Sequence, residues 1–143
     1  MPLHIIKLCV GCDTLADLAD WQKQRLKDLK AKGKKPELVH VTRMTPKRGP
    51  EILDGGSLYW VIKGQIAARQ KILGIRETKK NGVPHCGLVH HPKLIPVSPR
   101  PRRAFQGWRY LEGADAPPDL AQTKGATGLP ESLQRELAAL GLL

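Results

Sequence analysis

The order of apolar and polar residues predicts a strand followed by an amphipathic helix at the start of the chain. Residues 4–10 are nearly all apolar, which is typical of a buried strand. Most leucines between Thr14 and Gly33 fall on one helical stripe, and Thr14 with Asp17 forms a capping-box pattern. We therefore expect a helix that begins after Thr14, ends near Gly33 and packs on a sheet.

Segments rich in β-branched and aromatic residues predict further strands, at residues 38–44, 57–63, 65–77 and 83–90. Asn81-Gly82 is a strong signal for a tight hairpin turn between the last two. The prolines from Pro92 to Pro101 favour a sheet edge or a polyproline path for the short extended segment 94–97.

These elements predict an α+β domain over residues 1–112. Its sheet is mainly antiparallel, with five or six strands, either open or closed into a small β-barrel. The first helix packs on this sheet. Residues 113–130 are rich in Gly, Ala, Pro and Asp, and we expect a linker or a surface loop there. Spaced leucines after Pro130 predict a C-terminal helix over residues 131–143.

Alternation divides the strand at 57–63 into two faces. Leu58, Trp60 and Ile62 form an apolar face that we expect in the core, whereas Tyr59 and Lys63 share the more polar face. Tyr59 and Lys63 are therefore candidates for contact with a ligand. Together with Glu51, they are also candidates for acid–base chemistry, provided that burial lowers the pKa of the lysine.

Charge and composition favour a polyanionic partner. The 143 residues carry a formal net charge of +11, and residues 37–112 alone hold fourteen Lys/Arg against five Asp/Glu. A field of this sign attracts nucleic acid, nucleotides or acidic surfaces. Within this segment, arginines surround three aromatic residues, Phe105, Trp108 and Tyr110. Guanidinium groups bind phosphates and rings stack on bases, although Phe105 and Trp108 are better explained as core anchors of a proline-rich loop.

We therefore expect a nucleic-acid-binding module, for RNA more than for DNA, rather than an enzyme. The expected contacts are Arg43, Lys47, Arg48, Tyr59, Lys63, Arg69, Arg100, Arg102, Arg103 and Arg109. Two alternatives stay open. One is a small enzyme for a nucleotide or nucleoside-like substrate, with Lys63, Tyr59 and Glu51 near the chemistry. The other is a basic adaptor that docks on an acidic protein or a ribosome.

Cysteine and histidine residues allow a weaker hypothesis of a zinc site. Cys9 and Cys12 form a C-x-x-C pair, and His85-Cys86 could complete four ligands. The spacing is unusual, and Cys9 lies in a strand pattern where it behaves as a small apolar residue. We therefore expect no metal and no cofactor.

The chain is expected in the cytoplasm and away from membranes. Its start lacks the basic leader and long apolar stretch of a signal peptide, and no apolar run approaches the roughly 20 residues that span a bilayer. Three cysteines, an odd number, fit reduced thiols better than a disulfide framework. No pattern indicates an oligomeric state.

Four stretches carry a resemblance to a known family. They run from Leu3 to Cys12 (LHIIKLCVGC), from Thr42 to Arg48 (TRMTPKR), from Leu53 to Gly64 (LDGGSLYWVIKG) and from Arg103 to Leu111 (RAFQGWRYL). In these stretches the chain resembles the bacterial domain-of-unknown-function family 1489. The last two are specific motifs. The resemblance implies no activity, because none is attached to that family.

A second similarity is one of pattern. The succession of strand, helix, Met44-x-Pro46-Lys47, a glycine turn and two strands is similar to the small β-barrels of the PUA and ASCH superfamily. This similarity implies a PUA-like barrel that binds RNA or modified bases, and some ASCH-like members are amidohydrolases. The usual ASCH stretch Gly-x-Lys-x-x-Glu-x-Arg is absent here, so no catalytic residue is carried over.

Overall fold

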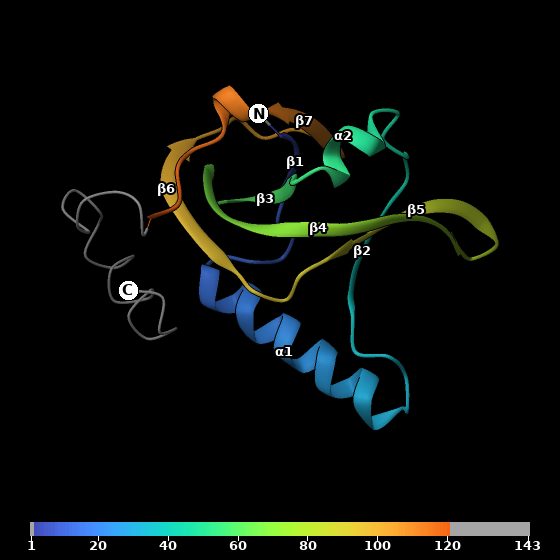
Figure 1. Ribbon diagram of the computed structural model, residues 1–143. Coiled ribbons are helices and arrows are strands. Elements are labelled where there is room, and N and C mark those ends of the chain that lie inside the picture. Colours follow the sequence, from blue (N-terminus) through green and yellow to red (C-terminus); the bar gives the residue numbers. More distant parts are fainter. Residues whose placement is uncertain (1, 121–143) are drawn as a thin grey trace.

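The long strand β4 (Gln65–Lys80) is the centre of the sheet in the computed structural model, which describes residues 2–120. It curves strongly across the molecule (Figure 1). Its first half pairs with β3 (Ser57–Ile62) and with β6 (Ile95–Pro101), and its second half pairs with β5 (Val83–His90). All three pairings are antiparallel.

Three more strands extend the sheet on both sides. β1 (Leu3–Leu8) pairs in parallel with β3, and β7 (Trp108–Glu112) pairs antiparallel with β1. At the other end, β2 (Leu38–Thr42) pairs with β5. The resulting path β2-β5-β4-β3-β1-β7 is open, with β2 and β7 at its ends and β6 on β4. The α+β class is confirmed, but the sheet has seven strands, is mixed and is not closed into a barrel.

The middle of the sheet is buried on both faces. All six residues of β3 are buried, and so are four of the six residues of β1. One face contributes Ile5, Leu58 and Trp60 to a core shared with the main helix, and the other contributes Ile6 and Tyr59 to a second, smaller core. Parallel strands covered on both faces are typically rich in apolar residues throughout, as β1 and β3 are.

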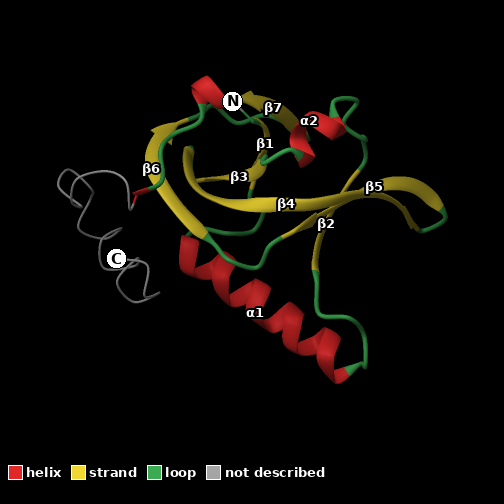
Figure 2. Cartoon of the chain, in the orientation of Figure 1, coloured by secondary structure: helices red, strands yellow, loops and turns green. Residues whose placement is uncertain are grey.

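Helix α1 (Leu15–Ala31) covers the larger core and lies along one side of the sheet (Figure 2). The predicted capping box is present, because the backbone N–H of Asp17 donates to Thr14 Oγ1 at 3.1 Å and Asp17 Oδ2 accepts from the Thr14 backbone N–H at 3.1 Å. Leu15, Leu18 and Gln22 are its buried residues. This helix is not long and apolar enough to cross a membrane, and neither is any other described helix.

A short helix, α2 (Gly49–Leu53), leads into β3 through a tight turn. A Cβ atom on Gly56 would lie 2.2 Å from the carbonyl oxygen of Leu3 and 2.4 Å from that of Ile52. No side chain fits there, so glycine lets the backbones of α2, β1 and β3 meet. Gly55, with φ +92°, supplies the left-handed turn before it.

Local signals in the sequence located most of these elements. The hairpin at Asn81-Gly82 is confirmed, with both residues at positive φ. β6 contains three prolines and lies beside β4, and among the described residues an isolated antiparallel bridge joins its Val97 to Asp119. A single turn of 3-10 helix, Gly113–Asp115, follows β7. The predicted C-terminal helix at 131–143 lies outside the described residues.

Candidate functional site

The segment from Arg100 to Arg109, here named the arginine loop, lies beside the turn that joins β3 and β4. The backbone N–H of Arg102 donates to the carbonyl oxygen of Gly64 at 2.8 Å. Lys63, at φ +47°, occupies the same turn and is exposed. The expected nucleic-acid contacts Lys63, Arg100, Arg102, Arg103 and Arg109 therefore gather at one end of the sheet.

Phe105 organises the charges of the arginine loop. Its ring is half-buried against the second core, and the guanidinium carbons of Arg102 and Arg109 both lie 5.5 Å from the ring centroid. Arg109 also donates to the carbonyl oxygen of Gln106, and Arg100 donates to that of Asp115. These partners are carbonyls and a ring. No ion pair among residues 2–120 includes an arginine of this loop. Its positive charges are therefore not neutralised by carboxylates in direct contact.

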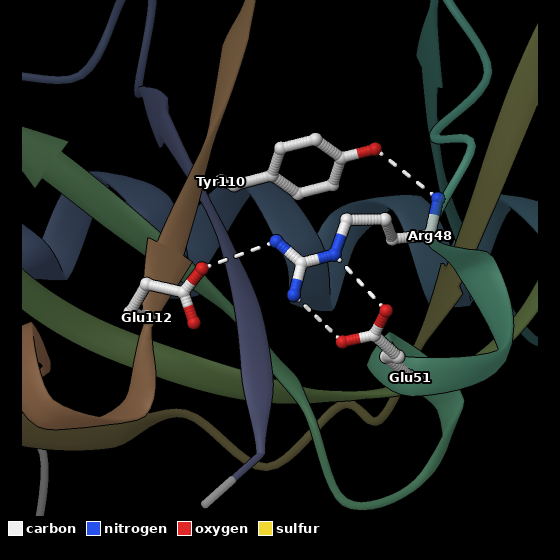
Figure 3. Close-up of polar contacts among 4 residues, drawn as sticks. All are labelled: Arg48, Glu51, Tyr110 and Glu112. Atoms are coloured by element: carbon white, nitrogen blue, oxygen red, sulfur yellow. Dashed lines mark hydrogen bonds and ion pairs between the residues drawn. The ribbon is translucent and has the colours of Figure 1, made fainter.

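Arg48 is held by carboxylates, in contrast to the arginine loop. Its guanidinium donates to both oxygens of Glu51, at 3.0 and 2.7 Å, and to Glu112 at 3.1 Å, while its backbone N–H donates to Tyr110 Oη at 3.2 Å (Figure 3). Hydrogen bonds from Arg48 lower the pKa of Glu51. This cluster fastens α2 to β7 and neutralises the arginine, so its geometry indicates a structural role.

Arg69 is also paired, at a more buried place. It donates to both carboxylate oxygens of Asp119, at 2.7 and 2.8 Å, and to Ser57 Oγ at 2.9 Å. The side chains of Arg69 and Asp119 are 24% and 19% exposed. Arg43, by comparison, is exposed and donates to the carbonyl oxygen of Pro84, and Lys47 is exposed.

The structure separates the residues suggested for acid–base chemistry. Tyr59 was predicted on the more polar face of its strand, but it is 3% exposed because the second core covers that face of β3. Burial raises the pKa of its hydroxyl. Lys63 and Glu51 lie beyond opposite ends of β3, and Glu51 is paired with Arg48. Lys63, Tyr59 and Glu51 thus form no common site in this structure.

The suggested zinc ligands are also separated. Cys86 is fully buried in β5, and His85 Nδ1 lies 2.9 Å from the carbonyl oxygen of Val83 in the same strand. Cys9 and Cys12 are half-buried beside α1. Residues 2–120 contain no group of three or more His, Cys, Asp or Glu side chains placed to hold a metal. All three cysteines are free thiols.

Cys9 and Cys12 instead line a cavity of about 620 Å³ between the end of β1, the start of α1 and strands β2 and β3. Its other lining residues include Lys7, Trp21, His40 and Trp60. Cavities of this size are in the range of small-molecule sites. His40 Nε2 is buried and has no hydrogen-bond partner within residues 2–120. The cavity is thus largely apolar, with a few polar groups in its wall.

Burial shifts the pKa values of these groups. Burial, with smaller contributions from Lys7 and His90, lowers the pKa of His40 to about 4, so the ring is neutral at pH 7. Burial also lowers the pKa of Lys7. Burial, together with a hydrogen bond to Cys12, raises the pKa of the Cys9 thiol. A protonated Cys9 is a weak nucleophile.

Sequence reasoning missed His40 and Lys7 as candidates. The signal for Lys7 was present, because it is the one charged residue in an otherwise apolar strand. His40 lies in a segment predicted as a strand, but the lack of a hydrogen-bond partner for its Nε2 among the described residues depends on the fold. Trp21 of α1 lines the cavity and is 62% exposed.

Over residues 2–120, the chain folds as an α+β protein with an open, mostly antiparallel sheet of seven strands and one main helix. It belongs to the family described as "Protein of unknown function (DUF1489)", whose family model matches residues 5–143. The resemblance to that family is thereby confirmed. No curated protein and no solved structure matches the chain, and nothing in these comparisons supports the similarity to the PUA and ASCH superfamily.

Proposed function

We propose that this protein binds single-stranded nucleic acid, RNA ahead of DNA, through the arginine loop and Lys63. The observation that carries the proposal is that the guanidinium carbons of Arg102 and Arg109 both lie 5.5 Å from the Phe105 ring centroid, without carboxylate partners among residues 2–120. Guanidinium groups without such partners are available to phosphates, and their planes also stack on unpaired bases. RNA comes first because proteins read unpaired bases mainly in RNA loops and ends.

The proposal reduces the set of expected contacts. Arg48 and Arg69 are committed to carboxylates, and Tyr59 is buried, so these three are no longer offered as contacts. Arg43 and Lys47 are exposed and lie outside the arginine loop. They extend the basic surface without forming its centre.

The test compares two variants that each remove two positive charges. One is Arg102→Gln with Arg103→Gln in the arginine loop, and the other is Lys79→Gln with Lys80→Gln at the far end of β4. All four side chains are exposed. Binding of a fluorescent single-stranded RNA of about 20 nucleotides, and of DNA of the same sequence, is measured by anisotropy. The salt concentration is varied from about 50 to about 200 mM.

We expect the loop variant to lower the slope of log affinity against log salt by about 1.4, because each phosphate contact on a single strand contributes about 0.7. Affinity at low salt should fall on the order of tenfold, while the control variant stays close to the unmodified protein. If the two variants had equal effects, binding would depend on the net charge of the protein and not on the arginine loop. No binding at low micromolar protein would refute the proposal.

The adaptor alternative is separated by a second measurement. Material that co-purifies at mild salt is identified with and without nuclease treatment. A single protein partner that survives nuclease, and is lost in the loop variant, would assign the arginine loop to an acidic protein surface. Nothing in the geometry favours the enzyme alternative, because Lys63, Tyr59 and Glu51 lie apart.

A further inference from the structure

The cavity beside α1 has the features of a preformed ligand site. Its lining combines indole rings, apolar side chains and a small number of polar groups, among them Lys7 and His40. Its volume of about 620 Å³ would hold a ligand of the size of a nucleoside. Such an arrangement lets a planar ligand pack against apolar side chains and form a few hydrogen bonds at fixed positions.

His40 supplies the first independent indication of a ligand. Nearly all buried polar atoms in proteins have a hydrogen-bond partner, whereas His40 Nε2 is buried without one. The ring is held edge-on to Trp60, with 5.2 Å between ring centroids and an interplanar angle of 89°. His40 also lines the cavity, so a small rotation of its ring would present this nitrogen to the polar edge of a bound heterocycle.

Trp60 is held rigidly from behind. Its indole Nε1–H donates to Gln70 Oε1 at 2.9 Å, and Gln70 exchanges two amide hydrogen bonds with Gln22 of α1, at 2.7 and 3.0 Å. Gln70 is fully buried and Gln22 is 4% exposed. This network ties α1 to β4 and fixes the indole in the cavity wall, so the site does not need to reorganise when a ligand binds.

The cavity lies at the same end of the sheet as the arginine loop. Lys7 is paired with Trp60 in the β1–β3 ladder and with Trp108 of the loop in the β1–β7 ladder. The Cys9 backbone N–H donates to the carbonyl oxygen of Val61, two residues before Lys63. Phe105 of the loop packs on the second core, at the opposite face of the sheet from Trp60, so a strand that reaches both must pass around this end of the sheet.

We propose that the cavity binds a planar, hydrogen-bonding nitrogen heterocycle of the nucleobase type, seated against Trp60 and read by His40. The inference rests on the proposed function, since it assigns a base pocket to the same end of the sheet as the arginine loop. The base belongs either to an unpaired nucleotide of a bound strand or to a free nucleotide. Lys7, in the same wall, is placed to donate to an oxygen of that ligand.

The test uses AMP, GMP, CMP and UMP as free probes and the 20-nucleotide RNA as the strand. Perturbation of the Trp60 indole N–H signal is followed by NMR, and RNA affinity by anisotropy. His40→Leu removes the hydrogen bond, and His40→Gln restores a polar group in its place. Cys12→Phe fills the cavity from a half-buried position outside the buried core. Thermal unfolding establishes that each variant is folded.

We expect at least one nucleotide to shift the Trp60 signal with saturation, and His40→Leu and Cys12→Phe each to weaken that binding at least tenfold. His40→Gln should recover part of it. If the RNA competes for the Trp60 signal, the base comes from the strand. If only free nucleotides shift it, the ligand is a free nucleotide.

The failure of each proposal has its own signature. RNA binding that depends on the arginine loop, without any shift of Trp60 by nucleotides or RNA, would overturn the cavity proposal and leave the proposed function standing. Nucleotide binding at Trp60, without RNA binding to the protein, would do the reverse.

Discussion

The two kinds of arginine in this protein differ in what surrounds them. Arg69 and Arg48 meet carboxylates from other elements, whereas Arg102 meets the ring of Phe105. In the sequence all three stand in the same basic middle segment. The comparison teaches that the positions of Asp and Glu in the fold, rather than the density of arginine, decide which charges are available to a polyanion.

The sharpest way to test this comparison is to remove one arginine of each kind. Arg69→Met should cost about 3 kcal/mol of unfolding free energy, because it leaves the half-buried carboxylate of Asp119 without a cation. Arg102→Met should stay within about 0.5 kcal/mol, since its side chain is exposed. Urea unfolding measures both.

A double variant, Arg69→Met with Asp119→Leu, checks the cause. It should recover part of the loss, because it removes the unpaired carboxylate along with the arginine. If Arg69→Met and Arg102→Met lowered the unfolding free energy by the same small amount, burial of the Arg69–Asp119 pair would not stabilise the fold. The two kinds of arginine would then not differ in energy.

The stability of the folded protein in acid should depend on His4, a neighbour of Arg69. The Ser57 backbone N–H donates to His4 Nδ1 at 2.9 Å, a bond that requires the neutral ring. Burial, and to a lesser degree Arg69, lower the pKa of His4 to about 4. In the unfolded chain a histidine titrates near about 6.5. The unfolded state therefore binds the extra proton first, and stability falls as pH drops from 6.5 towards 4.

At pH near 4.5 this histidine alone should cost about 2 kcal/mol relative to pH 7. His40, whose pKa is lowered in the same direction, adds to the effect. The matched control is His4→Asn, which offers an acceptor to Ser57 and does not titrate, so its loss between the two pH values should be smaller by that amount. Identical losses in the two proteins would mean that His4 titrates normally in the folded state.

The sequence predicted elements that depend on local signals. The capping box at Thr14, the turn at Asn81-Gly82 and the apolar run of β1 are properties of a few neighbouring residues, and the structure confirms each. The parallel pairing of β1 with β3, and the strand β7, were not predicted. Both depend on which distant segments meet, and a run of residues around Trp108 rich in arginine gives no strand pattern.

The same limit applies to the candidate site. Alternation along β3 correctly placed Trp60 in a core but could not show that a second core covers Tyr59. The pairing of Arg69 with Asp119 joins residues fifty positions apart. Lys63 lies with the arginine loop because the turn at Gly64 meets that loop. Of the basic residues named from the sequence, only Lys63 and those of the loop lie together in this way.

The smallest expected effect concerns Arg48, which is paired like Arg69 but exposed like Arg102. The side chains of Arg48, Glu51 and Glu112 are 42%, 55% and 58% exposed, so water replaces much of what the pair supplies. Arg48→Met should lower the urea midpoint less than Arg69→Met does. RNA affinity should change by no more than about twofold, because two carboxylates already neutralise this charge. RNA affinity is measured by anisotropy at about 50 mM salt, the lowest concentration used for the loop variant. A tenfold loss of RNA affinity would place Arg48 in the binding surface. It would also show that an arginine paired with a carboxylate can still bind a polyanion.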